Sequence, residues 1–202
     1  MNAKVELLVT ASGHGFENNV WVVGDDSEVI VIDPAHDEHA VADLVAGRTV
    51  VEILLTHGHW DHTGAALRFA ALVGNPPVRL HEADRFLWDD EHPGAPFNPL
   101  HDGERFTVAG VELGVRHTPG HTPGSVSLVA PALGCVFTGD TLFEGGPGAT
   151  RWDYSDFALV IESITGRLFS LPDDMVVHTG HGRSTLIGTE RPQREEWIAR
   201  GW

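Results

Sequence analysis

The chain has 202 residues, of which 42% are hydrophobic and 21% are charged, and its formal net charge is -16. This composition suits a folded protein with enough apolar residues for one substantial core, and it excludes intrinsic disorder. The negative charge argues against a nucleic-acid partner, since proteins that bind phosphate backbones carry basic patches. We therefore expect one globular domain over residues 1–202.

We predict neither an export segment nor a membrane span. The first ten residues contain a short apolar stretch that Glu6 interrupts, and no run reaches the roughly 18 apolar residues that a span requires. The single cysteine, Cys135, lies in an apolar run, where it is expected to pack as a buried thiol. These features predict a cytoplasmic protein without membrane contact.

Short β-type runs alternate along the chain with segments of helical periodicity. Strands are predicted at residues 29–32, 51–55, 125–129 and 135–138, and a hairpin at 106–108 and 111–115. Helices are predicted over residues 65–73 and 157–168. Residues 89–104 are rich in Asp, His, Pro and Gly and are expected to form a long surface loop of the kind that often serves as a lid. The pattern favours a layered α/β sandwich.

The densest chemistry lies in residues 56–62, directly after a predicted strand. Residues two apart in an extended segment point the same way, so His57 and His59 can converge on one ion. A turn into a helix at His62 would direct Asp61 and His62 to a second point a few ångströms away. Neutral imidazole and carboxylate ligands suit zinc, and they also suit iron or manganese. The segment therefore predicts a metal centre.

Three further candidate ligands, His121, Asp140 and His181, stand at predicted strand ends beside glycine. Glycine permits sharp turns and close approach of the backbone to an ion. His117 has the same His-Thr-Pro-Gly setting as His121, so the residues alone do not choose between them.

These motifs resemble those of the metallo-β-lactamase superfamily. The resemblance rests on His57-x-His59-x-Asp61-His62, Pro119-Gly120-His121-Thr122, Gly139-Asp140-Thr141-Leu142-Phe143 and Gly180-His181-Gly182, and it extends over nearly the whole chain. Within the superfamily the chain is most similar to the glyoxalase II group, the hydroxyacylglutathione hydrolases, in their short bacterial form. The resemblance implies a four-layer αβ/βα sandwich of two mixed sheets flanked by helices.

The resemblance also implies two divalent metal ions, with zinc as the expected metal and iron or manganese as alternatives. One ion would be held by His57, His59 and His121, the other by Asp61, His62 and His181, with Asp140 between them. A bridging anion is needed physically, because two cations about 3.5 to 4 Å apart repel each other. Asp61 and Asp140 are the expected catalytic carboxylates, with Asp61 as a candidate proton shuttle.

The predicted activity is hydrolysis of an S-acyl adduct of a low-molecular-weight thiol. Arg151 and Arg183, beside the Asp140 and His181 motifs, are candidates for binding a substrate carboxylate. Two further residues are assigned supporting roles: Asp33 is expected to orient a ligand, and His178 to act behind the ligands or structurally. His14 is interpreted as a plain loop histidine, with a position at the pocket rim as the alternative, and His117 is left open.

Four alternatives accompany this prediction. The same superfamily includes persulfide dioxygenases that use one iron held by two His and one Asp. A lactonase is disfavoured because Phe143 stands where the resemblance leads us to expect Tyr, and a true β-lactamase because Asp140 supplies a bridging carboxylate. A non-catalytic, metal-stabilised module is disfavoured because seven ligands exceed what one closed tetrahedral site needs. The thiol carrier, the native metal and the oligomeric state stay open.

Overall fold

The computed structural model describes residues 3–13 and 15–201, so the role predicted for His14 falls outside the described residues. The first sheet contains six strands in chain order, with antiparallel pairing from β1 to β3 and parallel pairing from β3 to β6. Its strands are β1 (Lys4–Ala11), β2 (Glu17–Gly24), β3 (Glu28–Ile32), β4 (Thr49–Leu54), β5 (Val78–Leu80) and β6 (Asn98–Pro99).

The second sheet also has six strands, in the order β14-β13-β10-β9-β8-β7. Only β10 and β13 pair in parallel, so this sheet is mixed as well. Its strands are β7 (Arg105–Val108), β8 (Val111–His117), β9 (Val126–Ala130), β10 (Cys135–Gly139), β13 (Val176–Thr179) and β14 (Thr185–Leu186). A small separate ribbon consists of β11 (Leu142–Phe143) and β12 (Gly146–Pro147).

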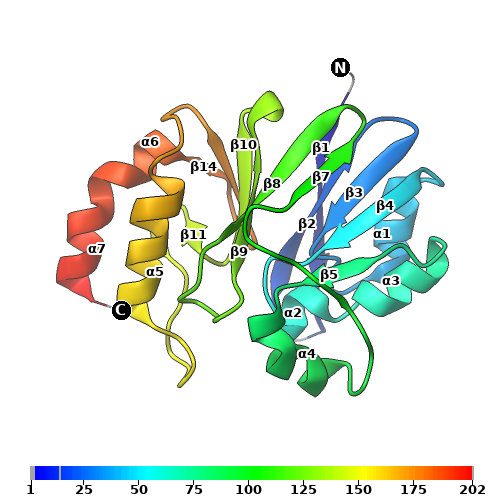
Figure 1. Ribbon diagram of the computed structural model, residues 1–202, viewed down its shortest axis with the longest axis horizontal. Coiled ribbons are helices and arrows are strands. Elements are labelled where there is room, and N and C mark those ends of the chain that lie inside the picture. Colours follow the sequence, from blue (N-terminus) through cyan, green and yellow to red (C-terminus); the bar gives the residue numbers. More distant parts are fainter. Residues whose placement is uncertain (1–2, 14, 202) are drawn as a thin grey trace.

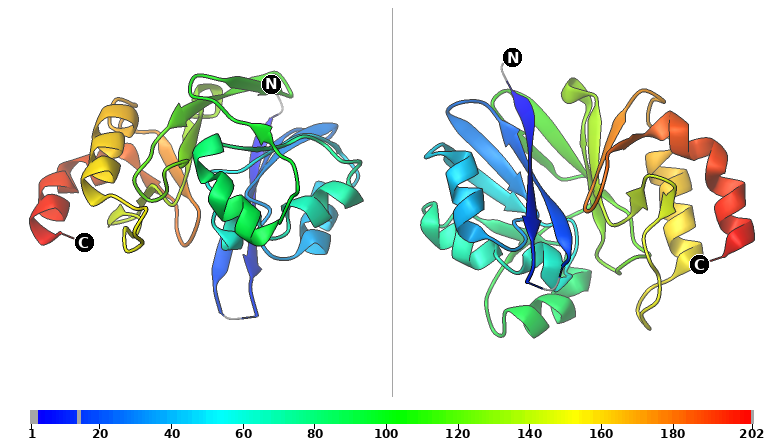
Figure 2. Two further views of the ribbon diagram at one scale, coloured as in Figure 1. Left: turned by 60° about the horizontal axis from the view of Figure 1, so that its bottom comes forward. Right: turned by 180° about the vertical axis from the view of Figure 1, so that it is seen from behind.

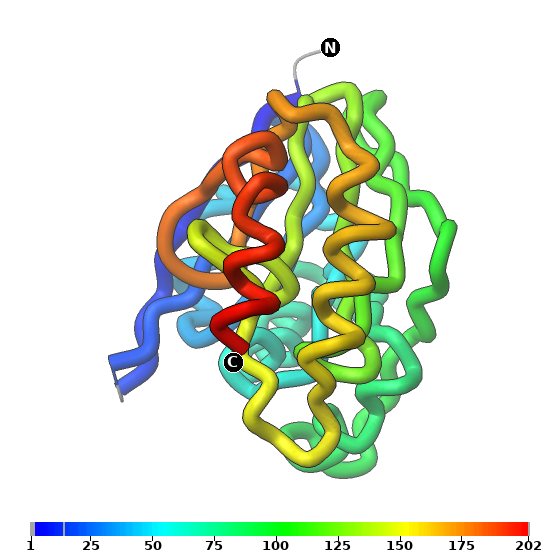
Figure 3. Tube along the Cα trace, turned by 90° about the vertical axis from the view of Figure 1, so that its left-hand side faces the viewer, coloured from blue at the N-terminus to red at the C-terminus, as the bar shows by residue number. Residues whose placement is uncertain are grey.

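Helices cover the outer faces of both sheets, as Figures 1 and 2 show. Those beside the first sheet are α1 (Glu38–Val45), α2 (Trp60–Thr63), α3 (Ala66–Leu72), η1 (Glu82–Asp84) and α4 (Arg85–Glu91). Those on the side of the second sheet are α5 (Phe157–Ser163), η3 (Ile164–Leu168), α6 (Ile187–Glu190), η4 (Arg191–Gln193) and α7 (Arg194–Arg200), and a turn η2 (Pro131–Leu133) joins β9 to β10. Figure 3 shows α5 and α7 side by side on the outer surface.

Alternation of side chains along the strands divides the buried apolar residues into three layers. In β3, Val29 and Val31 pack with the helices of the first sheet, whereas Ile30 and Ile32 face the second sheet. In β10, Phe137 belongs to the layer between the sheets, and Val136 packs with the outer helices on the other side. Helices, two sheets and helices therefore form the four-layer sandwich that the resemblance implied.

The segment 89–104 is only partly the loop that its composition predicts. Its first three residues belong to α4, Asn98 and Pro99 pair with β5, and Leu100 is fully buried. Backbone pairing and burial of Leu100 hold this part of the segment against the first sheet, so the expectation of a surface loop over the whole segment is wrong. The predicted strands, the hairpin and both predicted helices are confirmed within a few residues, although the second helix widens into a π-helical turn at η3. Within the described residues no helix is long and apolar enough to cross a membrane.

Candidate metal centre

Strand direction brings the chemically active residues to one edge of the molecule. Asp33 and His57 follow the parallel strands β3 and β4, and Asp140 and His181 follow the parallel strands β10 and β13. His121 follows β8, which runs in the same direction as β10 because both pair antiparallel with β9. Carboxyl ends of parallel strands meet at the same edge, and both sheets contribute such an edge here.

The first group of possible ligands consists of His57, His59 and His121. The Nε2 atom of His57 and the Nε2 atom of His121 each lie 3.0 Å from Nδ1 of His59. His59 is the extended residue that precedes α2, which places its ring beside that of His57 before the chain turns into the helix. All three histidines are buried, so their inward nitrogens share a small, dry space.

The second group consists of Asp61, His62 and His181. The Nε2 atoms of His62 and His181 lie 3.2 Å apart, and Asp61 Oδ2 lies 3.3 Å from Nε2 of His181. The helical turn of α2 supplies both Asp61 and His62, whereas His181 arrives from the other sheet. The amide Nδ2 of the buried Asn18 is 3.2 Å from Asp61 Oδ2 and restrains that carboxylate.

Asp140 lies between the two groups. Its Oδ2 is 3.6 Å from Nε2 of His121 and 3.4 Å from Nε2 of His181, and its Oδ1 is 3.3 Å from Nε2 of His62. Close packing requires glycine around this carboxylate, since a Cβ atom at Gly180 would lie 2.3 Å from Asp140 Oδ1. The carboxylate thus contacts both three-residue groups at once.

The second ring nitrogen of each histidine in the two groups is bonded to another protein atom. Backbone carbonyls accept from Nδ1 of His121 (Ala149, 2.7 Å) and from Nδ1 of His181 (Glu17, 2.6 Å). Since a carbonyl oxygen only accepts, Nδ1 carries a proton in both rings, and in the neutral form of each imidazole the lone pair is then on Nε2. The inward nitrogens therefore present lone pairs, as metal ligands must.

The remaining three histidines of the groups are oriented by side chains. Asp33 Oδ2 lies 3.0 Å from Nδ1 of His62 and accepts from the hydroxyl of Thr56, which is 3.1 Å from Nδ1 of His57. The hydroxyl of Tyr154 lies 2.8 Å from Nε2 of His59. Asp33 is thus located where the sequence analysis expects a residue that orients a ligand.

Electrostatics differ between the two groups. In the first group, burial and the neighbouring imidazoles hold the pKa of His57 well below its usual value and that of His59 at about 3. In the second group, burial lowers the pKa of His181, but the carboxylates of Asp140 and Asp61 outweigh this and raise it to about 10. Burial likewise disfavours ionisation of Asp140, yet His62 and His181 hold its pKa well below the usual range. Both carboxylates are therefore ionised at neutral pH.

These residues fit divalent metal ions. Nε2 of His57 and Nε2 of His121 each lie about 3 Å from Nδ1 of His59, and neutral imidazoles that turn their lone pairs toward one another at that separation repel unless a cation lies among them. Asp140 Oδ1 is buried and has no hydrogen-bond partner among the described residues, a costly state that a bound cation would relieve. The donor set of imidazoles and carboxylates suits zinc, iron or manganese.

A pocket of about 600 Å³ opens over the two groups. Aromatic side chains form much of its wall: Trp152 lies over the rings of His59 and His121, and its ring is stacked with that of Tyr154. Phe16 and Trp60, in edge contact with each other, line the opposite part of the pocket. The pocket is large enough for a small organic substrate.

Of the two candidate arginines only one lines this pocket, and His117 lies away from it. Arg151 lines it and its guanidinium lies over the Trp152 ring, whereas Arg183 is exposed and is not among the lining residues. His117 stacks on His81 and does not approach either group. The structure thereby selects His121 over His117.

For His178 the sequence analysis left two roles, one behind the ligands and one structural, and its contacts are structural. Its ring packs on Trp21 and Phe137, with centroids 4.2 and 5.1 Å away, and its Nδ1 is 2.9 Å from the hydroxyl of Ser184. Alternation along β13 turns His178 into the layer between the sheets, so its role is structural.

Four residues near the site escaped the sequence analysis. Asn18 and Tyr154 contact ligands, Trp152 covers them, and Asp84 accepts hydrogen bonds from the amides of Gly58 and Gly124, which ties the two ligand-bearing loops together. No motif marks Asn18 or Asp84, but Tyr154 is the single tyrosine of the chain and follows the Asp140 motif closely.

Comparison with known proteins agrees with this geometry. The family model described as the metallo-beta-lactamase superfamily matches residues 14–181. The chain therefore belongs to the metallo-beta-lactamase superfamily, and it is a hydrolase of that superfamily with His and Asp metal-binding groups.

Individual relatives cover nearly the whole chain. The hydroxyacylglutathione hydrolase GloC of Haemophilus influenzae is 32% identical, with 95% of each chain covered. Among solved structures, the BLEG-1 B3 metallo-beta-lactamase has a TM-score of 0.81 and 30% identity, covering 94% of this chain and 97% of that one. TTHA1623, solved in a di-iron-bound form, has a TM-score of 0.79 and 31% identity, covering 91% and 96%.

Proposed function

We propose that this protein is a dinuclear metal hydrolase that cleaves thioesters, namely S-acyl adducts of a low-molecular-weight thiol. The observation that carries the proposal is the contact of Asp140 with both three-residue groups, which supplies an anion between two cation positions. Similarity to the hydroxyacylglutathione hydrolase GloC supports the substrate class. The proposal includes a cytoplasmic location, where thiols are kept reduced.

The proposed ligand assignment follows the geometry. His57, His59 and His121 hold one ion, Asp61, His62 and His181 hold the other, and Asp140 contacts both. When bound, such a pair of ions supplies Lewis acidity toward a carbonyl group and lowers the pKa of water. Zinc is the proposed metal, and iron is tested beside it because TTHA1623 was solved in a di-iron-bound form.

The chain's own residues perform the remaining work. Asp61 is ionised, and the contacts of its Oδ2 with His181 and Asn18 hold the carboxylate in the pocket lining, where it is the proposed proton shuttle. Trp152 and Tyr154 shield the first group from bulk water. Arg151, held over the Trp152 ring, is the proposed partner of a substrate carboxylate, whereas the exposed Arg183 lies outside the pocket lining.

Metal content and turnover on the same sample test the proposal. Protein purified without added metal is submitted to elemental analysis and then assayed with S-lactoylglutathione, other acyl-thiols and a chromogenic β-lactam, the last because of the similarity to BLEG-1. Two equivalents of metal with thioester turnover support the proposal. Absence of turnover with every acyl-thiol contradicts it, and one equivalent of iron with oxygen uptake on a persulfide would favour the dioxygenase instead.

A matched pair of variants isolates the bridging carboxylate. Asp140→Asn keeps the shape of the side chain but removes the negative charge, so metal content should fall below two equivalents and turnover by at least a hundredfold. His101→Gln, which changes an exposed histidine outside both groups, should leave both unchanged. Normal turnover and metal content in Asp140→Asn would contradict the role of this carboxylate between the two ions.

A further inference from the structure

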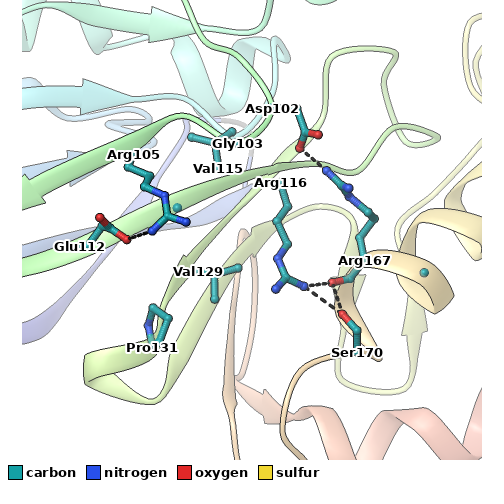
Figure 4. A pocket seen from close by; sticks show the side chains of 12 residues that line it. Asp102, Gly103, Arg105, Glu112, Val115, Arg116, Val129, Pro131, Arg167 and Ser170 are labelled. Carbon is teal, nitrogen blue, oxygen red and sulfur yellow. Dashed lines mark hydrogen bonds and ion pairs between the residues drawn. The ribbon is translucent and has the colours of Figure 1, made fainter.

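A second hollow, of about 460 Å³, lies on the helix-bearing face of the second sheet. Its floor is formed by Gly114 of β8 and by Val129 and Pro131, and its far side by the end of η3 around Arg167 (Figure 4). No residue that lines this hollow also lines the pocket over the metal-binding groups. The hollow is therefore a separate feature, and its volume falls in the range of small-molecule sites.

Three arginines surround the hollow in a chain whose formal net charge is -16. Arg105 is paired with Glu112 across the β7–β8 hairpin, and Arg167 is paired with Asp102. Arg116 has no carboxylate partner among the described residues; it donates to the carbonyl of Arg167 and to the hydroxyl of Ser170. The lining therefore has one positive charge in excess, and that charge belongs to Arg116.

The surroundings of Arg116 leave this charge uncompensated. Partial burial and the nearby Arg167 guanidinium lower the pKa of Arg116 from its ordinary value, and the carboxylate of Asp102, which is paired with Arg167, offsets this only in part. Both hydrogen bonds of its guanidinium use Nη1, so Nε and Nη2 have no partner among the described residues. Nε of Arg167 is likewise buried without a partner in that part of the chain. Free guanidinium donors around a hollow are suited to carboxylate and phosphate oxygens.

The floor of the hollow is open because Gly114 has no side chain. Arg116 and Glu112 stand two residues to either side of it on β8, so all three point to the same face of the sheet. A Cβ atom at Gly114 would meet only the carbonyl oxygen of Val129, at 3.9 Å. Glycine is thus not required here by crowding, and its absence of a side chain leaves room for a ligand over an apolar floor.

We propose that this hollow binds a small organic oxyanion, with a carboxylate or phosphate group held by Arg116 and the organic part resting on Gly114, Val129 and Pro131. The proposal does not depend on the hydrolase activity, because the two hollows share no lining residue. Arg105 and Arg167, each held by its own carboxylate, border the bound group from either side (Figure 4).

The experiment titrates the metal-loaded protein with inorganic phosphate and, separately, with succinate, and follows the arginine Nε–Hε resonances by NMR. The Arg116 resonance, assigned from its loss in Arg116→Gln, should shift saturably with at least one probe. Tighter binding of phosphate identifies a phosphorylated ligand, and tighter binding of succinate identifies a carboxylated one. If neither probe produces a saturable shift of Arg116, the proposal is wrong.

Two variants separate the hollow from anion binding elsewhere, including at the metal ions. Arg116→Gln should weaken the affinity for the effective probe about tenfold or more, the usual consequence of losing a charged hydrogen bond, as judged by the resonances of Arg105 and Arg167. Gly114→Leu keeps every arginine but fills the floor, and it should weaken affinity similarly. Arg85→Gln, a paired and exposed arginine elsewhere, is the control and should have no effect. Unchanged affinity in both Arg116→Gln and Gly114→Leu would overturn the proposal.

Discussion

Replacing Tyr154 by Phe removes one hydroxyl and tests whether residues behind the ligands set the affinity for metal. The hydroxyl lies 2.8 Å from Nε2 of His59, whose Nδ1 faces the first group. Burial and the carboxylates of Asp84 and Asp90 raise the pKa of Tyr154 to about 12, so the hydroxyl keeps its proton throughout the assay range. The phenyl ring retains the stacking with Trp152 and the edge contact with Phe86.

The magnitude follows from the hydrogen bond that is lost. In the metal-binding tautomer Nε2 of His59 donates to the tyrosine oxygen, and leaving a buried donor without a partner costs about 1 to 3 kcal/mol. At 1.4 kcal/mol per factor of ten, this range corresponds to about 5- to 150-fold. Because Tyr154 borders an open pocket, water can partly replace the hydroxyl. We therefore expect the dissociation constant of the metal in the first group to rise about tenfold.

Competition with a chromogenic chelator measures the dissociation constants, and circular dichroism checks that the variant is folded. Phe86→Leu serves as the control, since it alters the same aromatic patch without touching the hydrogen bond. The dissociation constant of the metal in the first group should rise in Tyr154→Phe and stay unchanged in Phe86→Leu. Metal affinity that stays within twofold of the wild type in a folded Tyr154→Phe protein would refute the reasoning.

Three further predictions concern steric fit, thiol reactivity and acid stability. Gly180→Ala places a Cβ atom 2.3 Å from Asp140 Oδ1, so it should reduce bound metal by at least one equivalent in elemental analysis, whereas Gly166→Ala, which meets no atom within 4 Å, should not. Burial raises the pKa of Cys135 to about 12, so a disulfide reagent at pH 8 should modify no thiol in the native protein and one in denaturant; rapid native labelling would contradict this. Burial lowers the pKa of His178 to about 4, so the folded state disfavours its protonation, and the stability it contributes above pH 6.5 is lost as the pH falls toward 4. Urea unfolding should therefore show a smaller acid loss in His178→Gln than in the wild type across that window, and equal losses would contradict the shift.

Most of the ligand set could be predicted because its members lie in short, recognisable motifs. The segment from His57 to His62 combines an extended stretch with the first turn of α2, and this local geometry determines which way each side chain points. The choice of His121 over His117 did not follow from local pattern, since both have the same neighbours. The choice depends on position relative to the edge: His117 is still within β8, whereas His121 lies beyond its end.

The supporting residues could not be predicted because they reach the site through tertiary packing. Asn18 is 43 residues from Asp61 in the chain, and Tyr154 is 95 residues from His59. His178 shows the converse case, since it is close to His181 in sequence, yet strand alternation turns its ring into the layer between the sheets. Residues far apart in the chain can therefore meet at the site, and residues close to a ligand in the chain can point away from it.

The same reasoning explains why the sequence predicts the metal centre but not the arginine-lined hollow. Ligands for a metal must converge within a few ångströms, and this demand produces dense motifs beside glycine. The arginine-lined hollow needs only one guanidinium without a counter-charge beside an open floor, and Arg105, Arg116 and Arg167 come from two strands and a distant helical turn. A single arginine on a strand is unremarkable in sequence, so its chemistry becomes evident only when the carboxylates that neutralise its neighbours are seen to leave Arg116 unpaired.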